Sequence, residues 1–210
     1  MLRLFVGIGF PPELKLRLSL LCSGLPGAKW VDPGNFHLTL RFIGEIGEDV
    51  AADVDEALSR LRARRFTLQI AGTGVFGGEK PRSLWAGIER GPELAGLHDK
   101  VEQALIRIGL SPEPRKFAPH VTLARLRDPP LDKLHEFLVA HAQFRADPLR
   151  VDRQVGRHGA RISAQSEGEI RRRGRQVNDE HVSARLNARR VRRATVQHVL
   201  RSNDVLERAR

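Results

Sequence analysis

Two segments of the sequence repeat one four-residue pattern of histidine, aliphatic residue, threonine and leucine. They are residues 37–40 (His-Leu-Thr-Leu) and residues 120–123 (His-Val-Thr-Leu). Side chains alternate between the two faces of a β-strand, so each histidine shares a face with its threonine. We expect the aliphatic face to pack on a core, which leaves the two histidine–threonine pairs free to line a cleft.

These residue types are suited to chemistry on a phosphate. Histidine has a reference pKa of about 6.5, so near neutral pH one imidazole can accept a proton while a second donates one. Each positioned acid or base contributes roughly 10²–10⁴-fold to a rate, and threonine hydroxyls can bind the oxygens of the anion. A single His-x-Thr in a strand is common and usually has no function, but two copies in strand context rarely arise by chance. The candidate site residues are His37, Thr39, His120 and Thr122.

The first 150 residues alternate between strand and helix patterns that could position these segments. Apolar residues recur at every second position in the expected strands, residues 2–10, 35–43, 66–75, 83–88, 119–126 and 143–151. They recur at helical spacing after Pro11-Pro12 and in the expected helices, residues 49–61, 92–108 and 131–141. Several strands have a half-buried pattern, which predicts an α+β fold with mostly antiparallel sheets.

One glycine-rich segment matches a nucleotide-binding pattern without its context. Residues 72–77 are Gly-Thr-Gly-Val-Phe-Gly, which fits G-x-G-x-x-G. A dinucleotide site needs a helix N-terminus directly after this motif to hold the pyrophosphate. Turn sequence and another strand pattern follow instead, so we interpret the segment as a hairpin connection.

The overall composition limits the class of protein. The chain has 210 residues, of which 40% are hydrophobic, and this suffices for one core of ordinary size. No apolar run is long enough to span a membrane. The single cysteine, Cys22, excludes a disulfide framework and a cysteine-based zinc site within one chain. We expect Cys22 to pack beside the first helix and the protein to be cytoplasmic.

Positive charge is unevenly distributed along the chain. The net charge of +11 comes mostly from the segment after Arg150, which contains arginine but neither lysine nor an aromatic residue. Such a segment buries little and tends toward disorder. We therefore predict a folded domain over residues 1–153 and a poorly ordered, arginine-rich tail over residues 154–210. Three interpretations of the tail stay open: a basic arm for nucleic acid, a loosely helical appendage, or a frame-shifted sequence.

The two histidine segments and their surroundings resemble the two-histidine (2H) phosphoesterases. The resemblance is specifically to the RNA 2′,3′-cyclic phosphodiesterases, also called 2′-5′ RNA ligase-like proteins, and it extends from Leu2 to about Arg153. The segments that carry it are residues 3–6 (Arg-Leu-Phe-Val), 30–31 (Trp-Val), 35–44 (Asn-Phe-His-Leu-Thr-Leu-Arg-Phe-Ile-Gly), 84–87 (Leu-Trp-Ala-Gly) and 117–125 (Phe-Ala-Pro-His-Val-Thr-Leu-Ala-Arg). After Arg153 the sequence departs from the family pattern, which predicts that a sheet in one lobe lacks its edge or a neighbouring strand.

The resemblance implies both a fold and an activity. The implied fold is a two-lobed α+β domain with a pseudo-twofold axis and a cleft between the lobes. The implied activity opens the 2′,3′-cyclic phosphate at an RNA end to a 2′-phosphomonoester, with no metal and no cofactor. No third ligand recurs beside either histidine, so the residues themselves do not indicate a metal site.

The resemblance also implies a role for each site residue. His120 accepts the proton of the attacking water, and His37 donates a proton to the departing 3′ oxygen. Thr39 and Thr122 bind the phosphate oxygens. In reverse, the same groups could form a 2′-5′ linkage between RNA ends.

Arg125 is a weaker candidate for contact with the phosphate or the RNA backbone. Its odd offset from Thr122 places it on the other face of the strand unless the strand bulges. A solvated arginine at the end of a strand is the alternative interpretation.

Two functions from different classes follow from these observations. The first is a monomeric enzyme that acts on RNA with a 2′,3′-cyclic phosphate end. The second is a catalytically silent RNA-binding protein whose tail supplies the affinity, which predicts salt-dependent binding that is lost on deletion of residues 156–210. The intact histidine–threonine pairs favour the enzyme.

Overall fold

The computed structural model of this chain describes residues 2–151 and 161–166. The strands are β1 (Leu2–Gly9), β2 (Ala28–Trp30), β3 (His37–Ile46), β4 (Phe66–Leu68), β5 (Ile70–Phe76), β6 (Ser83–Ile88), β7 (His120–Leu126), β8 (Leu149–Val151) and β9 (Arg161–Ser166). The helices are α1 (Pro12–Ser19), α2 (Glu48–Ser59), α3 (Pro92–Arg107) and α4 (Leu131–Ala140), and a 3₁₀ turn covers Pro33–Asn35.

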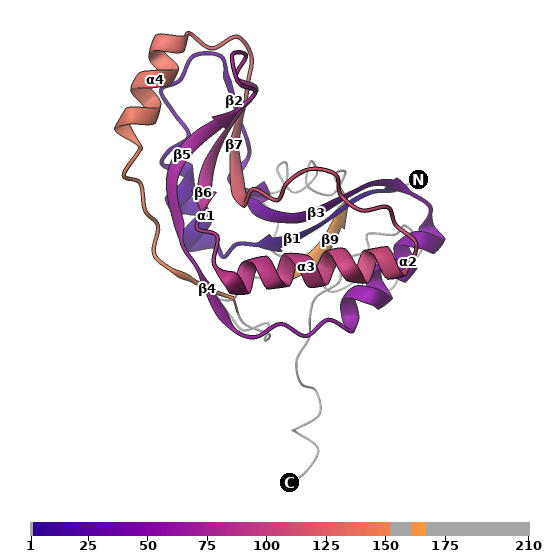
Figure 1. Ribbon diagram of the computed structural model, residues 1–210. Coiled ribbons are helices and arrows are strands. Elements are labelled where there is room, and N and C mark those ends of the chain that lie inside the picture. The colour runs from indigo at the N-terminus through magenta and orange to yellow at the C-terminus, as the bar shows by residue number, and fades with distance from the viewer. Residues whose placement is uncertain (1, 152–160, 167–210) are drawn as a thin grey trace, which may run out of the picture.

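The strands form two main sheets, in which neighbouring strands pair antiparallel. One sheet has the order β3-β1-β9 and the other the order β2-β7-β6-β5, while β4 and β8 pair separately. Figure 1 shows the four-stranded sheet standing at one end of the three-stranded sheet, so that the two make an L. We call the sheet β2-β7-β6-β5 with α1 and α4 the upper lobe, and the sheet β3-β1-β9 with α2 and α3 the lower lobe. The predicted α+β class and the two lobes are confirmed.

One contiguous apolar core runs through both lobes. The helix α3 shows why its sequence folds as it does. Pro92 stands at the first helical position, where its missing N–H costs no hydrogen bond. The buried face of α3 consists of Leu94, Leu97, Val101, Ala104 and Leu105. Gly109 follows the helix with φ +92°, a left-handed conformation that glycine adopts readily and that ends the helix.

The lobes do not correspond to the two halves of the chain. The short strand β2, which the sequence pattern did not predict, crosses from the N-terminal half to pair with β7 at the edge of the upper sheet. The other predicted strands and helices are confirmed with ends that shift by a few residues, apart from residues 66–75 and 143–151. The first helix is also shorter than predicted, because its leucines at positions 14, 18, 21 and 25 have helical spacing but α1 ends at Ser19.

The expected strand over residues 66–75 is in fact two strands that belong to different sheets. Its first part, β4, pairs with β8, and its second part, β5, pairs with β6. Phe66, Leu68 and Ile70 are all buried, so the alternation of apolar residues continues through the change of partner. The prediction of one strand was wrong because a period-two pattern does not reveal which strand the backbone pairs with.

The expected strand over residues 143–151 is shortened to β8. Before β8, Arg145 forms an isolated bridge with Ala71. Pro148 precedes β8 and has no N–H to donate to a ladder, which accounts for the shorter strand.

The strand β9 corrects the prediction that a sheet lacks a strand after Arg153. Residues 161–166 pair antiparallel with residues 4–9 of β1, so the second edge of β1 is covered. The two strands pair through backbone N–H and C=O groups, so the pattern of residue types in the sequence did not predict this pairing. The boundary between residues 1–153 and 154–210 stays a prediction, and the tail other than β9 lies outside the described residues.

The glycine-rich segment and the cysteine both have the structural roles that the sequence predicted. Residues 72–77 lie in β5 and in the turn that joins it to β6, so the segment is a hairpin and no helix follows it. Cys22 packs against the core, and its burial raises the pKa of the thiol to about 11. A thiol with so high a pKa is a poor nucleophile near neutral pH.

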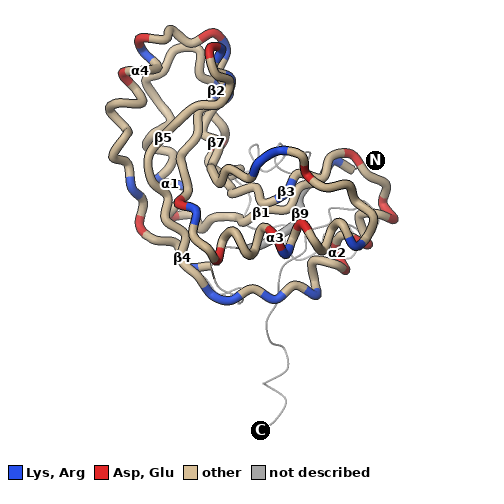
Figure 2. The backbone as a smooth tube through the Cα atoms, viewed as in Figure 1, with Lys and Arg blue, Asp and Glu red and all other residues tan. Residues whose placement is uncertain are grey.

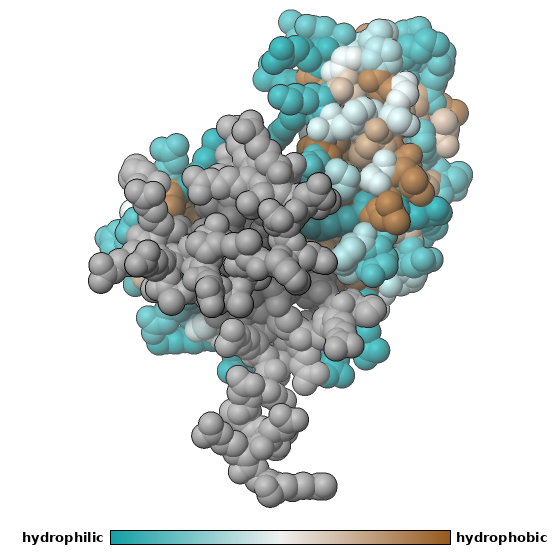
Figure 3. Space-filling view, turned by 180° about the vertical axis from the view of Figure 1, so that it is seen from behind, coloured by the Kyte–Doolittle hydropathy of each residue, from teal (hydrophilic) through white to brown (hydrophobic). Residues whose placement is uncertain are grey.

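Apolar residues also gather on the outside of the upper lobe. Figure 3 shows them from behind, and on α1 Leu16 and Leu20 are 66% and 65% exposed. Across residues 2–151 and 161–166, the helices are too short or too polar to traverse a membrane.

A buried arginine joins β3 to α3 and to the connection that leads to β7. Arg41 is only 7% exposed, and its Nε donates to the carboxylate of Glu102 at 2.5 Å. Its other nitrogens donate to the carbonyl of Ser111 and to the carboxylate of Glu113. Glu102 also accepts from the backbone N–H of Glu113 at 2.8 Å. These bonds fix the connection before β7 relative to β3.

We expect Arg41→Ala to lower the free energy of unfolding by about 3 kcal/mol, because it leaves the half-buried carboxylate of Glu102 without its cation. Urea unfolding measures the change. Arg60→Ala is the control, since the Arg60–Glu56 pair is exposed and should contribute less than about 1 kcal/mol. Equal effects of the two substitutions would contradict a structural role for the buried network.

Candidate active site

The two predicted histidines occupy matching positions in the two lobes. His37 is the first residue of β3 in the lower lobe, and His120 is the first residue of β7 in the upper lobe. The Cα atoms of β3 and β7 approach within 8 Å of each other where the lobes meet. The fold therefore brings the two histidine strands together from distant parts of the sequence, as the repeated pattern predicted.

Each imidazole is held by the same kind of hydrogen bond. Nδ1 of His37 bonds to the carbonyl of Asn35 at 2.6 Å, and Nδ1 of His120 bonds to the carbonyl of Ala118 at 2.7 Å. A carbonyl oxygen only accepts, so Nδ1 must carry the hydrogen in both rings. In the neutral rings Nε2 is then the basic nitrogen, and it is the atom left to exchange protons with a substrate.

Aromatic side chains pack against both rings. Phe5 stacks on His37 with 4.6 Å between ring centroids, and Phe76 meets His120 edge-on at 4.8 Å. Gly7 makes room beneath the first ring, since a Cβ there would lie 2.8 Å from the backbone oxygen of Leu38 and 3.5 Å from Cδ2 of His37. The rings are therefore fixed by packing as well as by hydrogen bonds.

The surroundings lower the pKa of both histidines. Burial is the largest cause in each ring, because it disfavours the charged imidazolium. The charges of Lys15 and His120 lower the pKa of His37 further, and the charge of Arg125 does the same to His120. The bonds to Asn35 and Ala118 act in the opposite direction. Both rings are thus mainly neutral near pH 7 when no anion is present.

The two threonines lie beside the histidines with accessible hydroxyls. Thr39 and Thr122 are half-buried, each two residues after its histidine on the same strand face. Neither hydroxyl has a hydrogen-bond partner among the described residues. Neither threonine oxygen is among the buried polar atoms that lack a partner. Both can therefore donate to the oxygens of a bound phosphate.

A β-bulge in β7 decides the position of Arg125. Thr122 and Ala124 pair with successive residues of β6, so Leu123 is an extra residue in the strand. Leu123 and Ala124 are both buried, whereas Arg125 is exposed. The bulge thus shifts the alternation by one residue and places Arg125 on the face of His120 and Thr122. The effect of the arginine charge on the pKa of His120 agrees with this position.

The strand β3 contains a bulge at the corresponding place. Thr39 and Arg41 pair with successive residues of β1, which leaves Leu40 as the extra residue. Leu40 and Arg41 are both buried, as are their counterparts in β7. This bulge turns Arg41 away from the face of Thr39 and into the network with Glu102.

Sequence reasoning missed three side chains that affect the site. Lys15 and Phe5 influence His37, and Phe76 packs on His120. Their spacing relative to the histidines carried no signal, because they reach the site through strand pairing and helix docking. Within the described residues, no cluster of three histidine, cysteine, aspartate or glutamate side chains could hold a metal ion.

The family model of the LigT-like phosphoesterases matches residues 8–85 and 88–155 of the chain. The chain belongs to this family. Its curated relatives include proteins named RNA 2′,3′-cyclic phosphodiesterase from Aeropyrum pernix and Thermotoga maritima. The first is 45% identical over 115 residues, which are 54% of this chain and 65% of the relative. The second is 34% identical over 160 residues, which are 72% of this chain and 83% of the relative.

Solved structures, Escherichia coli LigT among them, have the same fold. A protein from Thermus thermophilus superposes with a TM-score of 0.56 at 25% identity, and the match covers 78% of this chain and 87% of that one. Escherichia coli LigT in complex with 3′-AMP superposes with a TM-score of 0.56 at 24% identity over 79% of this chain and 87% of that one. The predicted 2H phosphoesterase fold is therefore confirmed.

We expect Lys15→Ala to raise the pKa of His37, because a nearby cation disfavours the protonated ring. NMR titration of the imidazole resonances measures it. Arg17→Ala on the same helix is the control and should leave the titration unchanged. A pKa of His37 at or above its ordinary value of 6.5 in the unaltered protein, or no response to Lys15→Ala, would contradict the proposed environment.

Proposed function

We propose that this chain hydrolyses the 2′,3′-cyclic phosphate at an RNA end to a 2′-phosphomonoester. The observation that carries the proposal is the matched pair of imidazoles, each bonded through Nδ1 to a carbonyl and each beside a half-buried threonine. The curated relatives named RNA 2′,3′-cyclic phosphodiesterase support the choice of substrate.

The reaction needs one base and one acid on opposite sides of the phosphorus. Nε2 of His120 takes a proton from water as the water oxygen bonds to phosphorus. The bond from phosphorus to the 3′ oxygen breaks, and Nε2 of His37 gives its proton to that oxygen. The product keeps the phosphate on the 2′ oxygen, and the rings regain their starting states by exchange of protons with water. With the 5′-hydroxyl of a second RNA in place of water, the same proton transfers would form a 2′-5′ linkage between the two RNA ends as the bond from phosphorus to the 3′ oxygen breaks.

The anionic substrate supplies the protonation state that this mechanism requires. Without an anion, burial and neighbouring cations keep the pKa of each histidine low. A bound cyclic phosphate favours the imidazolium and raises the pKa of the rings beside it. One ring can then hold a proton as the acid while the other stays neutral as the base.

The hydroxyls of Thr39 and Thr122 hold the non-bridging oxygens from the two lobes, and Arg125 adds a positive charge on the same face. These neutral and charged donors stabilise the negative charge that develops on the phosphate oxygens.

The proposed chemistry uses no metal and no cofactor. The monomeric state and the cytoplasmic location stay predictions, and so does the alternative of a silent RNA-binding protein, whose tail lies largely outside the described residues.

Replacing either histidine should nearly abolish turnover. We expect His37→Ala and His120→Ala each to lower kcat by about 10²–10⁴-fold on an oligonucleotide with a 2′,3′-cyclic phosphate end, assayed in EDTA. His135→Ala is the control, because His135 is exposed on α4. Undiminished activity in the double variant, or a 3′-phosphate product, would contradict the proposed function.

The threonines should act through their hydroxyls. We expect Thr122→Val, which keeps the shape and loses the donor, to lower kcat/KM roughly 10²-fold, as the loss of an oxyanion donor does. Thr122→Ser keeps the hydroxyl and should keep most of the activity. If the valine and serine variants lose activity equally, the threonine acts through packing and not through phosphate binding.

A further inference from the structure

We infer that three cations on the upper lobe, Lys29, Arg125 and Arg127, bind the backbone of the RNA strand that leads to the cyclic phosphate. The inference rests on the proposed function and deepens it. A 2′,3′-cyclic phosphate stands at the 3′ end of an RNA, so the rest of the strand must leave the site along one surface. We call these three residues the basic track.

The sheet fixes the three residues next to one another. Lys29 of β2 lies directly opposite Arg125 of β7 in the antiparallel register. The backbone N–H of Arg127 donates to the carbonyl of Gly27 at 2.8 Å, which extends the same pairing beyond the strand ends. Directly paired residues place their side chains on the same face of a sheet, so Lys29 shares the face of Arg125.

The face that carries the basic track is the face of the catalytic residues. The bulge at Leu123 puts Arg125 beside His120 and Thr122, and Arg127 follows two residues later with the same alternation. Without the bulge the cations would point to the core side of the sheet. The track therefore begins at the phosphate site and continues to the far end of β7.

The charges of the track are exposed and unpaired. Lys29, Arg125 and Arg127 are exposed, and none forms an ion pair or a side-chain hydrogen bond with another described residue. Two other surface cations of this lobe are neutralised, Lys133 by Glu136 and Arg145 by Glu89. Asp128 follows Arg127 and is the acidic residue adjacent in sequence, so the track keeps a local excess of positive charge.

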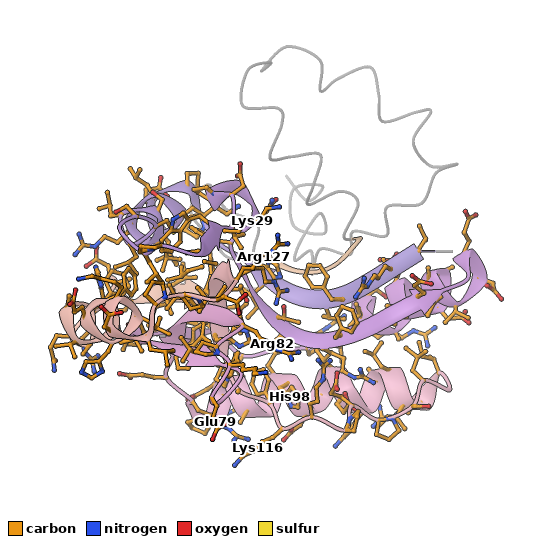
Figure 4. All side chains as sticks on the ribbon, turned by 90° about the horizontal axis from the view of Figure 1, so that it is seen from above. Lys29, Glu79, Arg82, His98, Lys116 and Arg127 are labelled. Carbon is orange, nitrogen blue, oxygen red and sulfur yellow. The ribbon has the colours of Figure 1, made fainter. Side chains whose placement is uncertain are left out.

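The pictures agree with this placement. Figure 4 shows Lys29 and Arg127 side by side, on the side of the upper lobe that faces β1 and β3. Figure 2 shows basic positions near β2, where the upper sheet ends. Arg82 belongs to this end as well, because its carbonyl accepts the backbone N–H of Leu126.

The spacing between Arg125 and Arg127 at the end of β7 is similar to the spacing of phosphates in a nucleic-acid backbone. Residues two apart in a strand are separated by about 7 Å, which is comparable to the distance between neighbouring phosphates of an extended single strand. A positively charged surface that follows the backbone binds single-stranded RNA without preference for sequence. Arg125, with Lys29 directly opposite it, would contact the phosphate nearest the site, and Arg127 the next phosphate along the strand.

The test compares a long and a short substrate with the full chain. The variant Lys29→Gln/Arg127→Gln should raise KM for a single-stranded oligonucleotide with a 2′,3′-cyclic phosphate by about tenfold or more at low salt. It should leave kcat/KM for a mononucleoside 2′,3′-cyclic phosphate essentially unchanged. The slope of log KM against log salt for the oligonucleotide should fall by about 0.7 for each cation removed. Lys133→Gln is the control and should leave the KM and the kcat/KM of both substrates unchanged.

Each result supports or overturns the inference. Unchanged KM and salt slope for the oligonucleotide would overturn it, and so would equal losses on the long and the short substrate. If the unaltered protein turns over neither substrate, the proposed function fails. The basic track is then judged by fluorescence anisotropy with a labelled oligonucleotide that ends in a 3′-phosphate. Lower affinity and a smaller salt slope in the double variant would support the track, and unchanged binding would overturn it.

Discussion

The hydrogen bond from each imidazole Nδ1 to the carbonyl two residues earlier is the interaction on which the site depends. It turns Nε2 of His37 and His120 away from the protein backbone and fixes which nitrogen can exchange a proton. The strands β3 and β7 supply these bonds because each begins directly at its histidine, where the preceding carbonyl can fold back onto the ring. The same local geometry, used once in each lobe, produces two equivalent groups, which we propose face a single phosphate.

A bulge follows the threonine in both β3 and β7, but it places an arginine differently in the two strands. In β7 the extra residue brings Arg125 to the site face, whereas in β3 it turns Arg41 into a buried network with Glu102. One lobe therefore gains an exposed cation for an anionic ligand, and the other gains a structural link to α3. This difference would let a pseudo-symmetric fold support the proposed reaction, in which the acid and the base have different neighbours.

Much of the site could be predicted from the sequence because its signal is local. The repeat of histidine and threonine two residues apart identified His37, Thr39, His120 and Thr122, and the apolar alternation identified most strands and helices. The partner of each strand could not be predicted, since pairing depends on backbone groups that many residue types share. That limit explains the change of partner between β4 and β5, the addition of β9, and the unpredicted strand β2. The side of the strand on which Arg125 lies depended on a bulge that residue types do not signal.

We propose that Nε2 of both imidazoles, and not Nδ1, faces the substrate. This proposal is tested most directly by ¹⁵N NMR of the His37 and His120 rings during a titration with a nucleoside 2′-monophosphate, the proposed product. We expect neutral rings protonated at Nδ1, and on addition of the ligand a rise in the pKa of both rings together with the largest ¹⁵N shifts at Nε2. Neutral rings protonated at Nε2, or a response from only one of the two histidines, would contradict it.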